Sequence, residues 1–157
     1  MHPIARSLAG VTALAFLAVQ SSAAGAAERA CRTSLDRGVL PAWARTGFSD
    51  PLPRMPHVVG RDGRIAAIVF GDPLTVPPRR DRDNKILWVP RSTPSGFSDL
   101  VIRAQRTRGT AALGRPVTRR VAGGPGPSII DLPAPGCWRL SLRWSGRSDT
   151  LDLVYRR

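Results

Sequence analysis

The stretch LPAPGCWRLSLRWSGRSDTLDLVY, residues 132–155, carries the clearest structural signal in the chain. Apolar and polar residues alternate at period two through its first half, which is typical of a strand with one buried face. Residues 145–149 are polar and predict a turn, after which the alternation resumes. The stretch therefore predicts an antiparallel hairpin whose two strands share one core. The residues expected to face that core are Trp138, Leu140, Leu142, Trp144, Leu151, Leu153 and Tyr155.

The first 27 residues have the layout of an export signal. Arg6 and the N-terminal amine form a short positive region, residues 8–19 form an apolar run, and small residues lead to a cleavage site after Ala26 or Ala27. A run of about a dozen residues is shorter than the roughly 20 that span a bilayer. The sequence therefore predicts a secreted chain with no stable membrane insertion after cleavage. Residues 28–157 form one domain in this interpretation, and residues 28–56 are its N-terminal arm.

Two cysteines occur, Cys31 and Cys137. Disulfides persist outside the cell, so one bridge between the two is expected. Cys137 lies on the side of the hairpin that carries Arg139 and Ser141, away from the Trp138 side. The bridge should therefore hold the N-terminal arm to the outside or the end of the domain, unlike the buried inter-sheet bridge of antibody domains.

The rest of the domain reads as short strands separated by turns rich in the 15 glycines and 15 prolines of the chain. The strand at 64–70 is continuously apolar and is expected to be central. The segment 115–121 places Arg119 on the side of Val117 and Val121, which predicts an edge strand or a bulge. Residues 107–114 are expected to form a turn. The remaining predicted strands are 57–60, 85–89, 99–106 and 128–132. The total of about seven or eight short strands predicts an all-β fold, a Greek-key β-sandwich.

The N-terminal arm ends in a proline-rich stretch. Pro41 can begin one helical turn and Gly47 can end it, after which three prolines enforce an extended path. Two interpretations remain open for this stretch. It packs across an open end of the β-domain, or it is an exposed recognition loop that carries Trp43 and Phe48.

The charge is strongly positive, with a formal net value of +13. Lys85 is the only lysine among the 24 basic residues, a bias that GC-rich codon usage also produces. A charge of this size favours anionic partners, which outside the cell include anionic cell-wall polymers. A solvated surface is the alternative explanation. The candidate binding residues are Arg79, Arg80, Arg82 and Lys85 in one loop, Arg139 and Arg143 on the outward side of the hairpin, and Trp43, Phe48 and His57 in the arm and just after it.

The sequence predicts no catalytic residue, cofactor or metal. His57 is the only histidine after the export signal, and no serine lies in a G-x-S-x-G motif. Residues 81–84 begin like a calcium loop, but Lys85 takes the place of an oxygen ligand. The exported location also argues against a nucleic-acid partner. A monomer is expected.

The segment LPAPGCWRLSLRW resembles the corner and penultimate strand of immunoglobulin-like domains. In those domains a tyrosine hydroxyl usually closes the corner; here Trp138 takes that position, and its indole N–H would replace the hydroxyl. Together with GVLPAWARTGF, MPHVVG, NKILWV and PGPSIIDLP, the chain also resembles a group of small exported proteins of high-GC bacteria. The resemblance implies an extracellular location and an immunoglobulin-like sandwich, and it transfers no catalytic residue.

Three hypotheses for function follow. The first is a non-enzymatic extracellular module that binds an anionic polymer or another envelope protein. The second is a protease inhibitor or weak hydrolase that uses the loop at 43–57. The third is a structural spacer without a ligand.

Overall fold

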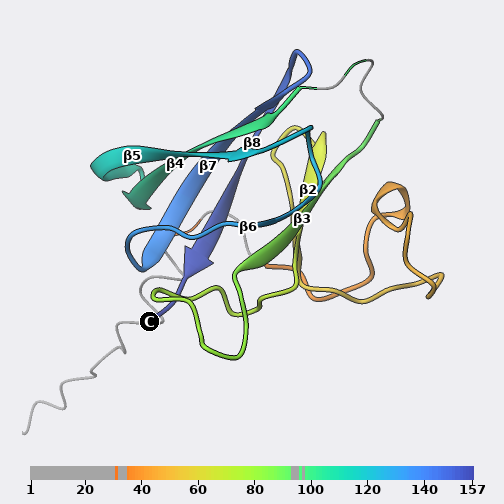
Figure 1. Cartoon of the computed structure of the whole chain (residues 1–157), viewed down its shortest axis with the longest axis horizontal. Helices are drawn as coiled ribbons and strands as arrows, with labels where there is room; N and C mark the ends of the chain where they lie inside the picture. Colours follow the sequence, from red (N-terminus) through yellow and green to blue (C-terminus); the bar gives the residue numbers. More distant parts are fainter. Residues whose placement is uncertain (1–30, 32–34, 93–95, 97) are drawn as a thin grey trace, which may run out of the picture.

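The computed structural model describes residues 31, 35–92, 96 and 98–157, so the predicted export signal lies outside the described residues. Within these residues the chain forms eight strands, in two antiparallel sheets of four, and one short 3-10 helix (Figure 1). The prediction of an all-β sandwich is confirmed. The elements are η1 (Ala42–Ala44), β1 (His57–Val59), β2 (Ile65–Val69), β3 (Lys85–Pro90), β4 (Leu100–Arg108), β5 (Ala111–Val121), β6 (Pro127–Ile129), β7 (Gly136–Trp144) and β8 (Arg147–Tyr155).

The two sheets differ in strand length. One, called the short sheet here, has the order β1-β2-β3-β6, and none of its strands is longer than six residues. The other, the long sheet, has the order β5-β4-β7-β8 with strands of 9 to 11 residues. One apolar cluster joins their facing sides, with Ile65 and Trp88 from the short sheet and Ile102 and Leu140 from the long sheet. The core therefore lies between the sheets.

The hairpin of β7 and β8 forms as the alternation predicts, but its turn is shorter than expected. Trp144 pairs with Arg147, so only Ser145 and Gly146 connect the strands. Both have positive φ, 43° and 71°, which is the backbone of a two-residue hairpin turn that matches the strand twist. The prediction of a turn over 145–149 is wrong because polar residues at 147–149 continue the strand. Asp149 is consequently a buried strand residue.

The hairpin of β4 and β5 also extends further than predicted. The expected turn at 107–114 is wrong, because β4 continues to Arg108 and β5 begins at Ala111. A bulge between Ala104 and Arg106 shifts the register within β4. β5 is an edge strand of the long sheet, as predicted, and the Nε of Arg119 on its inner side donates to the carbonyl of Asp131.

β2 is buried on both sides, as the continuous apolar run predicts. Ile65, Ala67 and Val69 belong to the core, whereas Ala66 and Ile68 alternate outward and are still fully buried. Residues 36–56, called the covering segment here, lie on this outer side of the short sheet, as the orange chain in Figure 1 shows.

The covering segment folds as a hairpin extension of β1. Asp36 pairs with His57 and Val39 with Arg54, two bridges in one antiparallel register. The helix η1 lies in the connecting loop where Pro41 and Gly47 predict a helical turn, and the buried Leu40 and Ala44 fasten it. The full burial of Leu40 and Ala44 shows that the segment is packed, whereas its position across an open end of the sandwich stays a prediction.

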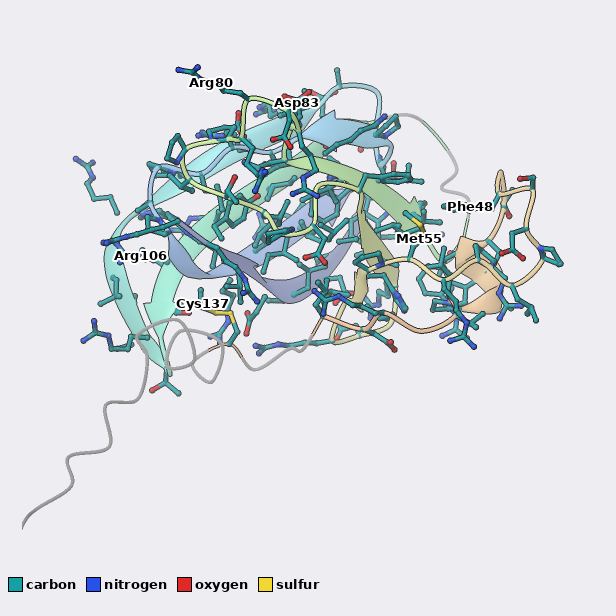
Figure 2. The ribbon with its side chains drawn as sticks, turned by 90° about the horizontal axis from the view of Figure 1, so that it is seen from below. Phe48, Met55, Arg80, Asp83, Arg106 and Cys137 are labelled. Carbon is teal, nitrogen blue, oxygen red and sulfur yellow. A yellow bond between two sulfur atoms is a disulfide. The ribbon has the colours of Figure 1, made fainter. Side chains whose placement is uncertain are left out.

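The disulfide joins Cys31 to Cys137, which are 106 positions apart in sequence and whose Cα atoms lie 5.5 Å apart. Cys137 is 2% exposed but lies outside the core cluster, in the outward row of β7. The bridge therefore holds the start of the arm to the outer side of the long sheet, as predicted. In Figure 2, Cys137 and Phe48 of the covering segment lie at opposite sides of the molecule.

Candidate binding surfaces

The outer face of the long sheet gathers arginines that sequence order keeps apart. The strand register places Val101 of β4 between Arg120 of β5 and Arg143 of β7. Arg103, two residues further along β4, pairs with Ser141 and Thr118 on the same strands. Arg103 is therefore a diagonal neighbour of both Arg120 and Arg143, at about 7–8 Å between backbone positions. We call these three exposed side chains, Arg103, Arg120 and Arg143, the arginine face.

The positive charge of the arginine face is largely uncompensated. Arg120 Nη1 lies 3.6 Å from Asp99 Oδ2, a pair between two solvent-exposed side chains that contributes little. Arg103 and Arg143 have no carboxylate partner among the described residues. Thr118 and Ser141 add exposed hydroxyls beside them. An open depression of about 320 Å³ borders Val101, Arg120 and Arg143.

Arg139 shares the outer side of β7 but has a different environment. Its Nε lies 3.2 Å from Asp152 Oδ1, and Arg61 Nη2 lies 3.1 Å from the other carboxylate oxygen. Asp152 is 1% exposed, so the two guanidinium groups compensate a buried negative charge. Arg139 therefore has an ion pair with a buried carboxylate that Arg143 lacks, although sequence reasoning grouped the two together.

The basic loop between β2 and β3 is also mostly engaged in its own structure. Arg79 and Asp81 form a two-bonded ion pair at 2.9 and 3.2 Å, and this hydrogen bonding lowers the pKa of the Asp81 carboxyl. Arg82 Nη1 donates to the carbonyl of Asp72 at 2.7 Å. Arg80 is exposed and extends away from the loop (Figure 2). The loop connects two strands of the short sheet, so the structure does not join it to Arg143.

The aromatic candidates help to hold the covering segment. Phe48 stacks on Phe70 with ring centroids 6.5 Å apart, and the Lys85 ammonium lies 5.6 Å from the Phe70 ring centre. Trp43 and Phe48 are half-buried, while Phe70 is 41% exposed. Phe48 and Lys85 are therefore brought together by Phe70, which sequence reasoning did not single out.

His57 is buried at the base of the covering segment, with 3% of its surface exposed. Its Nδ1 lies 2.8 Å from the carbonyl oxygen of Met55, and its Nε2 lies 3.9 Å from Asp36. The ring therefore links the end of the covering segment to β1 through the contact with Met55, and it is almost completely buried.

Sequence reasoning missed Arg103 and Arg120. Both were recognisable as outward residues of their own strands, but only the pairing of β4 with both β5 and β7 makes them neighbours of Arg143.

Comparison with known proteins adds no further assignment, since no family model, curated protein or solved structure matches the chain. In the part of the chain that the structure describes, no three acidic, histidine or cysteine side chains cluster as a metal site. The same residues contain no helix long and apolar enough to cross a membrane. The arginine face is therefore defined by its geometry and charge.

Proposed function

We propose that this chain is an exported immunoglobulin-like domain. The order β5-β4-β7-β8 corresponds to the C′-C-F-G sheet of such domains, and β2-β3-β6 corresponds to A-B-E, with β1 added at the edge. The corner before β7 also supports this proposal. Trp138 Nε1 donates to the carbonyl of Ala134 at 2.8 Å, a bond equivalent to the one that a tyrosine hydroxyl makes in the corner of these domains.

We further propose that the domain acts without catalysis, as a binding module for anionic polymers of the cell envelope. The observation that carries this proposal is the arginine face. It presents three neighbouring exposed guanidinium groups on the outer side of the long sheet, and two of them have no carboxylate partner in the described residues. An open sheet face can contact several charged groups along an extended polymer, which a narrow pocket cannot do.

The proposed binding is electrostatic, so salt weakens it. Exposed charges interact over a Debye length of about 10 Å at 0.1 M salt, and this falls to about 3 Å at 1 M. Guanidinium groups suit phosphate, sulfate and carboxylate because two N–H donors can point to one anion. Retention on an anionic matrix should therefore decrease steadily as salt increases.

The test compares two double variants with the same loss of charge. Arg103→Gln with Arg143→Gln removes the two uncompensated charges of the arginine face. Arg80→Gln with Arg91→Gln removes two exposed charges from the loops of the short sheet. Binding to purified cell walls and to dextran sulfate is measured for each protein across a salt series. The face variant is expected to bind about tenfold more weakly than the wild type, and the loop variant about twofold.

Two results would contradict the proposal. One is a wild type with no retention even at the lowest salt, which would mean that the net charge has no such partner. The other is an equal loss of affinity in both variants, which would make binding depend on total charge and remove the role of the arginine face.

A further inference from the structure

A cavity of about 240 Å³ lies at the seam where β8 passes β1. Val58, Val69, Leu74 and Leu153 form part of its wall, and all four belong to the core cluster. The lining also includes Leu35, from the arm. The cavity thus reaches from the surface into the edge of the apolar core.

The size of this cavity restricts what it can hold. It exceeds the ~150 Å³ of an apolar cavity that binds benzene, and it is smaller than the ~300 Å³ at which sites for drug-sized ligands begin. A single ring or a short alkyl chain fits this range. The apolar wall favours such a group over water, which needs two to four polar partners to remain in a cavity.

The rim of the cavity is charged. Arg37 Nη2 lies 2.7 Å from Asp72 Oδ2, and 60% of the Arg37 side chain is exposed. Arg156 also borders the cavity, and its backbone pairs with Leu74 and Val76 and so holds the loop that forms one wall. The Arg37 guanidinium therefore has donors available on its exposed side.

Asp152 supplies the second carboxylate of the lining, and it is compensated from outside the cavity. Arg61 and Arg139 both bind it, so this group of three side chains carries a net positive charge. Arg82 donates to the carbonyl of Asp72 and brings a further cation toward the rim. The surroundings of the cavity are therefore positive on balance, and they favour a negatively charged ligand group over a positively charged one.

We propose that this cavity binds a small amphiphile: a ring or short alkyl chain enters the apolar part, and a carboxylate lies at the rim beside Arg37 and Arg156. This site is separate from the arginine face and does not depend on it. The arm contributes Leu35 and Arg37, so the site also gives the arm a role beyond covering the domain.

The test uses octanoate as the probe and isothermal titration calorimetry as the measurement, with the disulfide intact. Octylamine has the same chain and the opposite charge. Octanoate is expected to bind at least tenfold more tightly than octylamine. Arg37→Gln is expected to weaken octanoate about fivefold while leaving octylamine no weaker. Arg108→Gln, at the tip of the β4–β5 hairpin, is the control and should change nothing.

A second variant tests the apolar part. Val154→Trp adds volume at a half-buried position of the lining and should abolish octanoate binding, with a far-ultraviolet spectrum that confirms the fold. If this variant does not fold, the proposal is tested by the binding of octanoate and octylamine to the wild type and to Arg37→Gln. The proposal is overturned if the wild type gives no heat with millimolar octanoate, if octylamine binds equally well, or if Arg37→Gln leaves octanoate affinity unchanged. The double variant of Arg103 and Arg143 should bind octanoate normally, so this result is separable from polymer binding.

Discussion

The outward-facing side chains of the two sheets differ in their exposure to solvent. Ala66 and Ile68 point outward from the short sheet, on the side where the covering segment lies, and both are fully buried (Figure 1). Arg103 and Arg143 occupy the equivalent outward positions of the long sheet, and they stay in solvent. An apolar outward row must be covered to stabilise the fold, because burying a side chain such as isoleucine contributes about 1.5–3 kcal/mol. A charged outward row must stay open, since burying unpaired charges is costly. Among the described residues, the arginine face is therefore the part of an outer sheet face that is open to solvent.

The most direct way to break this comparison is to place the same charge on each face. Ile68→Asp buries a carboxylate beneath the covering segment, and it should cost more than about 4 kcal/mol of the free energy of unfolding, because both apolar contact and desolvation are lost. Arg103→Asp on the open face should change it by no more than about 0.5 kcal/mol. Urea unfolding followed by circular dichroism measures both. Similar losses in the free energy of unfolding for the two variants would contradict the claim that one outer face is buried and the other is exposed.

The local features of both faces were readable from the sequence. The alternation in residues 138–144 predicted which side of β7 faces the core, and the apolar run of β2 predicted burial on both sides. The outward position of Cys137 followed from the same alternation. These predictions succeeded because a strand's side-chain directions are set by its own period of two.

Features that depend on contacts between residues distant in sequence could not be predicted from the sequence. The arginine face exists because β4 pairs with both β5 and β7, and no local pattern specifies this order. Asp149 was expected in a polar turn and Asp152 was not singled out, yet both are buried, since partners distant in sequence satisfy their oxygens. The sequence predicted a turn through Asp149 for the same reason: composition alone does not show that a polar residue has buried partners.

Substitution of Asp149 tests whether the two sheets unfold as one unit. Its carboxylate accepts hydrogen bonds from the backbone N–H groups of Asp62 and Arg64, at 3.0 and 2.9 Å, and so ties the β1–β2 turn of the short sheet to β8. Asp149→Ala should cost about 3 kcal/mol, because these donors lose their partner in a buried site. A Cβ on Gly60 would meet the same carboxylate, so Gly60→Ala should have an effect in the same direction.

Asp81→Ala is the control for this prediction, because Asp81 is exposed and pairs only within its own loop. Thermal unfolding measures all three variants. If Asp149→Ala unfolds at the same temperature as Asp81→Ala, then the carboxylate does not hold the two sheets together.

Tyr155 links the sheets at the other end of β8, and its titration is observable because it is the only tyrosine in the chain. Its hydroxyl donates to the carbonyl of Ile130 at 2.6 Å. Burial, and then the negative charge of Asp131, raise the pKa of Tyr155 well above its usual range. The unfolded chain ionises near pH 10, so its tyrosine releases a proton that the folded one keeps. Stability from this group is therefore complete below about pH 10 and decreases as pH rises further. Absorbance at alkaline pH should show tyrosinate only when circular dichroism shows unfolding; tyrosinate in the folded protein would contradict the burial.

The smallest expected effect concerns the two ends of β7 beneath the arginine face. Trp138 and Trp144 are both 2% exposed on the inner side of that strand. Trp138 Nε1 donates to the carbonyl of Ala134, whereas Trp144 Nε1 is buried with no partner among the described residues. A tryptophan-to-phenylalanine substitution removes similar volume at each site, but only at 138 does it also break a hydrogen bond and leave a carbonyl without its donor. Trp138→Phe should therefore cost about 1 kcal/mol more than Trp144→Phe in urea unfolding. Equal costs would show that the corner bond stabilises neither β7 nor the arginine face on its outer side.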